Sequence, residues 1–252
     1  VIRGEACARA AHQLAQKGYK PDLICAHPGW GEALFLKDIW PSVPILCYQE
    51  FFYNSTGVDY DFDPLLQGQR SWQDCANLRM KNSHLLLSLE FSDWNVTPTQ
   101  FQRSVFPERW QGRISCIHDG IDVNNVCPDP SVPPLRLPDG SVIRRGDPVV
   151  TFVNRHVEPY RGFHVFMRSL PILQNLYPEA CIVIVGEQQG VSYGKAAPSG
   201  SWKSILLDEL DGDIDLSKVH FTGTLPYAQF LQLLRITSVH VYLTYPFVLS
   251  WS

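Results

Sequence analysis

The sequence is poor in charge and has no apolar run long enough to cross a membrane. Charged residues make up 18% and apolar residues 45% of its 252 positions, whereas globular proteins carry roughly 25% charged residues, so a disordered chain is excluded. The longest clean apolar run, residues 180–185, is far shorter than the roughly 18 residues that span a bilayer. A net charge of −4 gives no basic surplus for a nucleic-acid partner. We expect a globular, cytoplasmic protein without a signal peptide.

Metal-binding patterns are also missing. The seven cysteines are scattered and form no CxxC pair, so we predict buried, reduced thiols rather than a zinc site. Asp59, Asp61 and Asp63 alternate but lack the glycine and the distal glutamate of a calcium loop, which favours a solvated loop. The sequons at Asn54 and Asn95 are interpreted as chance matches, because no secretory signal precedes them.

Both ends of the sequence look cut. The chain opens with Val1 and not Met, and apolar residues at positions 7, 10, 11 and 14 already have helical spacing without a preceding cap. Residues 245–252 stop with no terminal helix or polar tail. We therefore infer a fragment that is truncated at both ends.

What the sequence does contain is an alternation of short apolar runs and amphipathic segments. We predict strands over residues 21–27, 43–48, 95–97, 114–117, 149–153, 181–185, 219–221 and 239–243. We predict helices over residues 33–38, 71–89, 162–175, 202–210 and 227–235. This alternation is typical of α/β domains with parallel sheets, which bind ligands at the carboxyl ends of the strands.

A proline-rich stretch interrupts the alternation. Residues 127–147 contain five prolines and two glycines, which predicts a linker or a domain crossover. We therefore predict an incomplete Rossmann-like domain over residues 1–126, the linker, and a truncated Rossmann-like domain over residues 148–252, with a cleft between the two domains.

Two arginines flank the first turn of the second domain. Arg155 follows a predicted buried strand, and Arg161 lies where the next helix begins, followed by Gly162. Two guanidiniums and a helix N-terminus at one strand end form an anion site suited to a diphosphate, and Gly162 permits close approach of the backbone. The spacing alone leaves open the alternative of two surface arginines that flank a loop.

Two further strand ends carry glycines against which a nucleotide could lie. One is Gly186 with Glu187, and the other is the segment at 221–225. Either could also be an ordinary turn. The chain contains neither GxGxxG nor GxxxxGK[ST], which argues against a dinucleotide dehydrogenase and a P-loop enzyme.

Three groups of residues together resemble the retaining glycosyltransferases of family 4, the group 1 glycosyltransferases, which have the GT-B fold. They are the Asn-Arg to Arg-Gly segment at 154–162 with the strand end at 184–186, the Phe-Thr-Gly-Thr-Leu segment at 221–225 with its following helix and strand, and the segment at 117–122 with its prolines. The resemblance covers most of the chain and is strongest from Ile114 onward. It implies two Rossmann-like domains that bind a nucleotide-sugar donor and an acceptor, with no metal and no cofactor, since the nucleotide-sugar is a substrate.

The resemblance assigns the donor site to the second domain. It implies that the donor phosphates meet Arg155, Arg161 and Gly162, and that the nucleotide meets Gly186, Glu187, Thr224 and Leu225. The family usually has Lys in place of Arg161, which keeps the charge. It also carries two glutamates eight residues apart near this end of the chain; Phe247 stands at the first of these positions, and the second would lie beyond Ser252.

The resemblance places the acceptor on the first domain. Many family members carry a functional histidine where this chain has Gln49 and Glu50, so these two residues, with His27 at the neighbouring strand end, are our catalytic candidates. A structural role for His27 stays open. We expect the remaining acceptor-side or cleft residues to be Gly29, Trp30, Gly31, Glu32, His118 and Gly120.

The resemblance implies a metal-independent, hexosyl-type glycosyltransferase that retains configuration and acts on a glycan, lipid or small-molecule acceptor. The alternatives are a degenerate GT-B protein that binds a nucleotide or glycan, and a GT-B sugar-nucleotide epimerase. Peripheral membrane contact is an open partner prediction, although no basic amphipathic helix is evident in the sequence.

Overall fold

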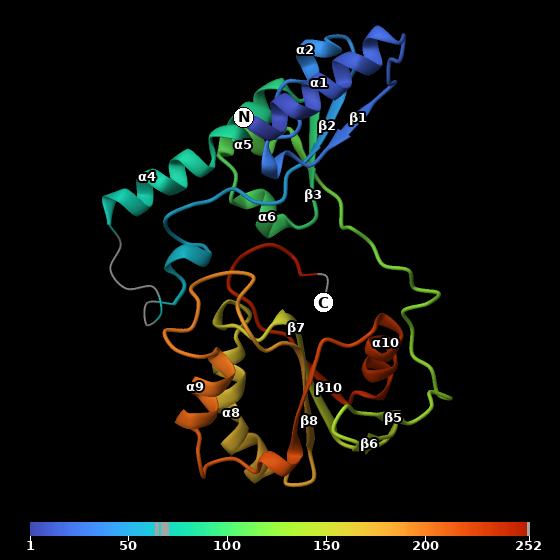
Figure 1. The fold of residues 1–252 in the computed structure, drawn as a ribbon, viewed down its shortest axis with the longest axis vertical. Helices are drawn as coiled ribbons and strands as arrows, with labels where there is room; N and C mark the ends of the chain where they lie inside the picture. Colours follow the sequence, from blue (N-terminus) through green and yellow to red (C-terminus); the bar gives the residue numbers. More distant parts are fainter. Residues whose placement is uncertain (64–65, 67–70, 251–252) are drawn as a thin grey trace. The chain divides into compact units, whose positions relative to one another are not determined.

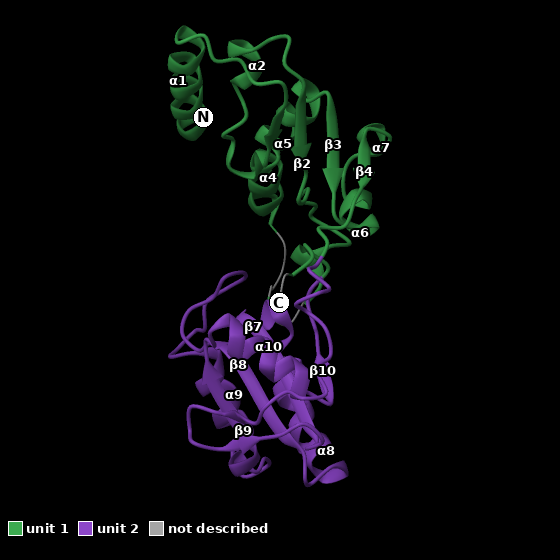
Figure 2. Ribbon diagram, turned by 90° about the vertical axis from the view of Figure 1, so that its right-hand side faces the viewer, with its two compact units in different colours: residues 1–120, 246–250 green, residues 121–245, 251–252 purple. Residues whose placement is uncertain are grey.

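The computed structural model describes residues 1–63, 66 and 71–250. These residues form two compact units: unit 1 comprises Val1–Gly120 and Pro246–Ser250, and unit 2 comprises Ile121–Tyr245 (Figure 2). Residues 251 and 252, at the predicted cut end, lie outside the described residues. Each unit is built around a parallel sheet, as the alternation of the sequence predicts.

Unit 1 contains a four-stranded parallel sheet in the order β1-β2-β3-β4 (Figure 1). Its strands are β1 (Ile24–Ala26), β2 (Ile45–Tyr48), β3 (Trp94–Thr97) and β4 (Ile114–Cys116). Its α-helices are α1 (Ile2–Gln16), α2 (Leu36–Ile39), α4 (Trp72–Lys81), α5 (Ser83–Phe91), α6 (Gln100–Ser104) and α7 (Glu108–Gln111). The carboxyl ends of the strands meet at one edge and bring together the residues that follow them.

One long predicted helix is divided in two at a buried asparagine. The sequence predicts a helix over residues 71–89, but α4 ends at Lys81 and α5 begins at Ser83. Asn82, only 4% exposed, uses its amide to bond the backbone of Tyr53, accepting from the N–H at 2.9 Å and donating to the carbonyl at 2.7 Å. Asn82 keeps a helical backbone, and its N–H still donates to the Leu78 carbonyl at 3.2 Å, so its amide marks the boundary between the two helices and ties it to another segment.

Unit 2 contains a second four-stranded parallel sheet, in the order β10-β7-β8-β9. Its strands are β7 (Val149–His156), β8 (Cys181–Glu187), β9 (Val219–Gly223) and β10 (Val239–Val241). Its α-helices are α8 (Phe163–Leu176), α9 (Trp202–Glu209) and α10 (Tyr227–Ile236). The segment predicted as a proline-rich linker lies in unit 2 and carries a small antiparallel pair, β5 (Leu135–Arg136) and β6 (Val142–Ile143).

The core of unit 2 shows why apolar side chains predominate on both faces of the first half of β7. Val150 and Phe152 of β7 pack into a cluster with α8 and α9, whereas Val149 and Val153 pack into a cluster with α10. Figure 1 shows α8 and α9 on one side of this sheet and α10 on the other. Burial of each large apolar side chain contributes about 1.5–3 kcal/mol, so both faces of β7 stabilise the position of the strand end that follows.

Candidate functional site

Arg161 is a buried guanidinium at the carboxyl edge of the unit 2 sheet. It lies in the 3₁₀ turn Pro159–Arg161, directly before α8, and is 9% exposed. Its Nη1 donates to Thr244 Oγ1 at 3.3 Å, and its guanidinium carbon lies 5.1 Å from the centre of the Tyr193 ring. Neither of these two partners carries a charge, and the buried Glu158 carboxylate, three residues earlier, interacts with the guanidinium electrostatically while its hydrogen bonds go to backbone N–H groups. A buried cation with neutral partners is suited to bind an anion.

Glycines allow the turns at this edge. Gly162 has φ +75°, and a Cβ there would overlap the Cβ of Leu243, so only glycine fits between the turn and the chain after β10. Gly186 ends the buried part of β8 with φ +149°, and a Cβ there would come within 2.5 Å of the Asn154 carbonyl oxygen. Both glycines that are predicted at the donor site therefore have a steric role.

The other predicted donor-site residues differ in their placement. Arg155 lies within β7 and not after it, because the strand continues to His156, which pairs with Glu187 of β8. Its side chain is exposed. The Glu187 carboxylate accepts from the backbone N–H groups of Gln188, at 2.9 Å, and Gln189, at 3.3 Å, so it shapes the loop after β8.

The two predicted base-region residues follow β9. Thr224 is exposed, whereas Leu225 is partly buried against the α10-side cluster of the unit 2 core. No side-chain contact brings these two residues together with Arg161, so their assignment to the nucleotide stays a prediction.

Sequence reasoning missed three residues around Arg161: Glu158, Tyr193 and Thr244. Glu158 is fully buried, and its Oε2 accepts from the N–H groups of Ser192, at 2.5 Å, and Tyr193, at 3.1 Å. Burial raises the pKa of Glu158. Its position three residues before Arg161 was a usable signal, whereas Tyr193 and Thr244 come from segments whose approach no local pattern indicates.

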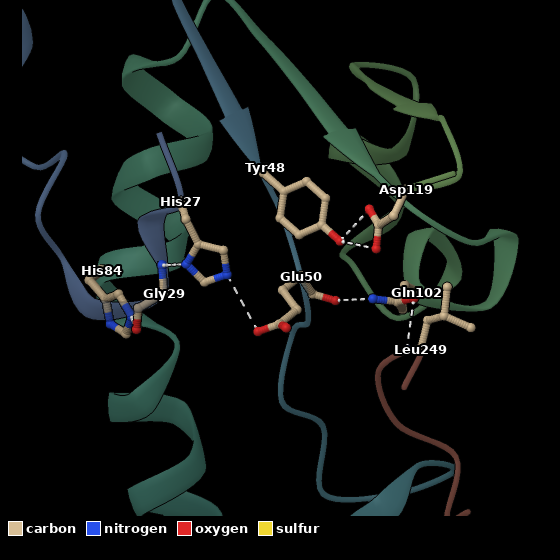
Figure 3. A network of polar contacts seen from close by, with 8 residues as sticks. All are labelled: His27, Gly29, Tyr48, Glu50, His84, Gln102, Asp119 and Leu249. Carbon is tan, nitrogen blue, oxygen red and sulfur yellow. Dashed lines mark hydrogen bonds and ion pairs between the residues drawn. The ribbon is translucent and has the colours of Figure 1, made fainter. Parts of the chain in front are cut away.

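In unit 1, the carboxyl edge joins two predicted catalytic candidates. His27 follows β1 and Glu50 follows β2, and His27 Nε2 lies 3.4 Å from Glu50 Oε2 (Figure 3). The ring's Nδ1 accepts from the N–H of Gly29 at 3.1 Å, which leaves the proton of the neutral ring on Nε2. The hydrogen bond with Glu50 raises the pKa of His27, whereas the Gly29 N–H opposes that rise because it needs the Nδ1 lone pair.

Tyr48 and Asp119 extend this edge, and sequence reasoning assigned neither of them a site role. The Tyr48 hydroxyl donates toward both carboxylate oxygens of Asp119, at 2.9 and 3.1 Å (Figure 3). The Tyr48 ring stacks on His27 with centroids 5.8 Å apart. Burial, followed by the Asp119 carboxylate, raises the pKa of Tyr48, so its hydroxyl keeps its proton. Tyr48 is the last residue of β2 and Asp119 follows β4, so both lie at the carboxyl edge of the sheet, and this placement was the available signal.

Gln49 requires a correction. The sequence analysis expects it to contact substrate, but its side chain is 0% exposed, and its Nε2 donates to Ser88 Oγ and Asn95 Oδ1, both at 2.9 Å. The alternation of side chains along an extended segment explains this: Tyr48 and Glu50 point to one side and Gln49 to the other. We therefore assign Gln49 a structural role in the interior of unit 1.

The loop after β1 carries four of the predicted acceptor-side residues. Trp30 is 67% exposed, with the Arg3 guanidinium 5.2 Å from its ring centre, and Arg3 also pairs with Glu32 at 3.1 Å. Gly31 is buried with φ +83°. Gly29 lies so close to the His27 ring that a Cβ would come within 2.5 Å of it, which explains why glycine donates that hydrogen bond.

A second histidine repeats the arrangement of the first. His118 follows β4, and its Nδ1 accepts from the N–H of Gly120 at 3.0 Å. Both residues are exposed, and Gly120 has φ +82°. The side chain of His118 therefore serves its own turn, and its free Nε2 remains available to a ligand.

The described residues contain neither a metal-binding cluster nor a membrane-spanning helix. No group of three or more His, Cys, Asp or Glu side chains there has the arrangement needed to hold a metal ion. Likewise, none of the described helices is long and apolar enough to span a bilayer.

Phe247, which stands where the resemblance expects a glutamate, packs into unit 1. It is 8% exposed, and its ring meets the Phe51 ring edge-on with centroids 4.6 Å apart. Nearby, the Leu249 N–H donates to Gln102 Oε1 at 3.3 Å, while Gln102 Nε2 donates to the Glu50 carbonyl at 2.7 Å (Figure 3). Gln102 thus links the 246–250 segment to the strand end that carries Glu50.

Comparison with known proteins gives a family match over the first half of the chain. The sequence profile described as "Glycosyl transferase family 4 group" matches residues 1–126. Among curated proteins, a phosphatidyl-myo-inositol mannosyltransferase of Propionibacterium freudenreichii subsp. shermanii is 26% identical over 161 residues, covering 51% of this chain and 42% of that protein. The chain therefore spans less than half of the curated relative it matches.

Solved structures agree on the fold. TarM matches with a TM-score of 0.58 and 12% identity over 94% of this chain and 40% of its own. The catalytic domain of Arabidopsis thaliana starch synthase IV, bound to ADP and acarbose, matches with a TM-score of 0.56 and 15% identity over 94% of this chain and 55% of its own. OtsA gives 0.58 and 10% identity over the same two shares. The fold is thus GT-B.

Proposed function

Because the chain belongs to the glycosyl transferase family 4 group, we propose that it is part of an enzyme that transfers a sugar from a nucleotide-sugar donor to an acceptor. Unit 2 binds the donor diphosphate at Arg161, with Arg155 as a second cation, and unit 1 binds the acceptor near His27 and Glu50. The reaction retains configuration and uses neither a metal nor a cofactor. The acceptor is a glycan, a lipid or a small molecule, and the protein works in the cytoplasm, in peripheral contact with a membrane when the acceptor is a lipid.

The observation that carries this proposal is the buried Arg161 guanidinium, whose hydrogen-bond partner and ring partner, Thr244 and Tyr193, are both uncharged. Negative charge grows on the diphosphate as the bond between the sugar and its phosphate breaks. A fixed cation in a site of low dielectric stabilises that charge in the transition state more than in the ground state. Each charge-assisted hydrogen bond to such an anion contributes about 1.5–3 kcal/mol, so one bidentate guanidinium accounts for a large share of donor binding.

On the acceptor side, His27 and Glu50 supply complementary groups. The Glu50 carboxylate, whose side chain is 47% exposed, accepts a hydrogen bond from an acceptor hydroxyl, and His27 orients that carboxylate through Nε2–H. The exposed Trp30 ring offers an apolar face to a sugar or another ring. Hexosyl transfer is supported by the relative, which is described as a mannosyltransferase.

Titration calorimetry with UDP, GDP and ADP tests the donor site. We expect Arg161→Ala to weaken binding of the preferred diphosphate at least about tenfold, which is roughly 1.4 kcal/mol. Arg161→Lys keeps a charge and should lose less. The matched control is Arg168→Ala, because Arg168 pairs with Glu209 at 2.6 Å on the outside of α8. Equal affinities of Arg161→Ala and the unmodified chain would refute this site.

Turnover of the complete protein tests the reaction. Transfer of sugar to an added acceptor supports the proposed transferase, and the configuration of the product tests retention. Donor binding without turnover would instead favour a binding protein. The presence of Phe247 at the expected glutamate position would agree with that outcome. Isomerisation of the donor would favour an epimerase.

A further inference from the structure

Glu158 is the most deeply buried acidic side chain at the donor edge, and the proposed function does not use it. It is 0% exposed, and its Oε1 is buried without a hydrogen-bond partner. A carboxylate is costly to bury, because the charged form loses its hydration, and burial raises the pKa of Glu158. The two backbone N–H groups that its other oxygen accepts offset part of this cost, so this buried side chain has a role beyond packing.

The carboxylate holds one specific pair of loop residues. Its Oε2 accepts from the N–H groups of Ser192 and Tyr193. His156, at the end of β7, adds a second tie, because its Nδ1 lies 2.7 Å from Ser192 Oγ. His156 and Glu158 therefore both bind Ser192 of the loop that follows β8, and Glu158 also binds Tyr193, across more than 30 positions of sequence.

The fastened loop places an aromatic ring over the donor-site cation. The Tyr193 ring centre lies 5.1 Å from the Arg161 guanidinium carbon, a distance at which cation–π attraction operates. The same ring lies 5.6 Å from the ring of Tyr160, which in turn lies 4.9 Å from the ring of Tyr245. Arg161 is therefore covered on one side by a ring whose backbone N–H is bound to Glu158.

We propose that Glu158 is a positioning residue for the donor diphosphate site: by fixing Ser192 and Tyr193 it holds the aromatic cover on Arg161 and sets the direction in which the guanidinium can donate. This inference rests on the proposed function only for the identity of the ligand. Glu158 contacts the loop amides and not the guanidinium, so it leaves the hydrogen-bonding edge of Arg161 to the anion. Its charge nevertheless interacts with that of Arg161 through the protein interior.

Loss of Glu158 should change the surroundings of Arg161 even when no ligand is bound. Without Glu158, the two amides lose their acceptor, the loop leaves β7, and the Tyr193 ring no longer covers Arg161. The guanidinium then becomes more accessible to solvent, and the direction of its N–H groups is less fixed. Since Arg161 is now 9% exposed, its accessibility can rise by up to about tenfold, as local opening replaces a packed contact.

The first experiment measures that accessibility without any nucleotide. Phenylglyoxal modification of Arg161 is followed by mass spectrometry in the unmodified chain and in Glu158→Ala, with the exposed Arg144 as an internal reference. We expect several-fold faster modification of Arg161 and an unchanged rate at Arg144. Equal Arg161 rates in the two proteins would overturn the proposal.

Conservative variants distinguish positioning from general damage. Glu158→Gln keeps an oxygen that can accept both N–H groups, so we expect modification of Arg161 to return to within about twofold of the unmodified chain. Tyr193→Ala should expose Arg161 and Tyr193→Phe should not, because the ring provides the cover. If Glu158→Ala does not fold, Glu158→Asp, whose carboxylate is one methylene too short to reach the amides, takes its place; slow modification there would equally overturn the proposal.

The second experiment adds the ligand. We expect Glu158→Ala to bind UDP, GDP or ADP, whichever the unmodified chain prefers, about tenfold more weakly, and Glu158→Gln to recover most of that loss. Faster modification of Arg161 with unchanged diphosphate affinity would refute the link to the donor site. If the unmodified chain binds none of the three, the proposed function fails, while the modification rates still decide whether Glu158 positions the cover.

Discussion

Gly162 offers a sharp test of the packing argument at the donor edge. It has φ +75°, and a Cβ added there would overlap the Cβ of Leu243. A left-handed backbone costs an alanine about 1–2 kcal/mol, and overpacking adds about 1–3 kcal/mol. Gly162→Ala should therefore destabilise unit 2 by about 2–5 kcal/mol, as the sum of those two costs.

A matched control isolates the steric part of this cost. Gly212 also lies in unit 2 and has φ +80°, but nothing lies within 4 Å of a Cβ built there. Gly212→Ala should therefore cost only the backbone share, about 1–2 kcal/mol. The difference between the two variants measures the overlap with Leu243 alone.

Hydrogen exchange of peptides from β7 and β8 in increasing urea reports the stability of unit 2 separately from that of unit 1. We expect the free energy of opening to fall by clearly more for Gly162→Ala than for Gly212→Ala. Because the overlap is with a Cβ atom, Leu243→Ala should not relieve it, whereas Leu243→Gly should. Equal losses for the two glycine variants would refute the reasoning from close approach.

Three further expectations concern titratable groups. Glu50→Gln should lower the pKa of His27, because the Glu50 hydrogen bond raises it; an unchanged NMR titration would contradict the pairing. The hydrogen bond with His220 lowers the pKa of Asp139 from 3.8 to about 2, so its contribution to stability is present above about pH 4 and is lost as the pH falls through the folded-state pKa. Since Asp139 is half exposed, Asp139→Asn should remove less than about 1 kcal/mol, measured by urea unfolding across that range. Burial raises the pKa of the Cys47 thiol to about 12, so iodoacetamide should label Cys47 only after unfolding, which mass spectrometry of native and denatured protein can check.

The fold was predictable where periodicity was strong. The apolar face of α8, with Phe163, Phe166, Met167 and Leu170 all buried, follows the spacing visible in the sequence. β7 was placed correctly but ends later than predicted, because its last residues pair with β8, and pairing is not encoded locally. The division between α4 and α5 was missed for a similar reason: the Asn82 amide bonds to a segment 29 residues away.

The candidate sites were predictable in location more than in detail. Strand ends selected His27 and Glu50 as candidates, and the structure brings these two side chains together at one edge of the unit 1 sheet, whereas Arg161 was selected as the start of a helix. The strand ends could not show that the Gln49 side chain points into unit 1. Side chains alternate along an extended segment, but the sequence alone does not tell which of them face the interior. The strand ends could not indicate Tyr193 either, because its approach to Arg161 depends on hydrogen bonds to Glu158 that form only once the loop has folded.

The division of the chain into units has a practical consequence for anyone who dissects this protein. Unit 1 includes residues 246–250 as well as residues 1–120, so its sequence is discontinuous. An expression fragment ending at residue 120 would uncover the Phe51 ring, which now packs on Phe247, and would remove the Leu249 N–H that Gln102 accepts. The 246–250 peptide that completes unit 1 must therefore be joined to the fragment by a linker or added as a separate peptide. Its affinity for the fragment would measure what these residues contribute to the stability of unit 1.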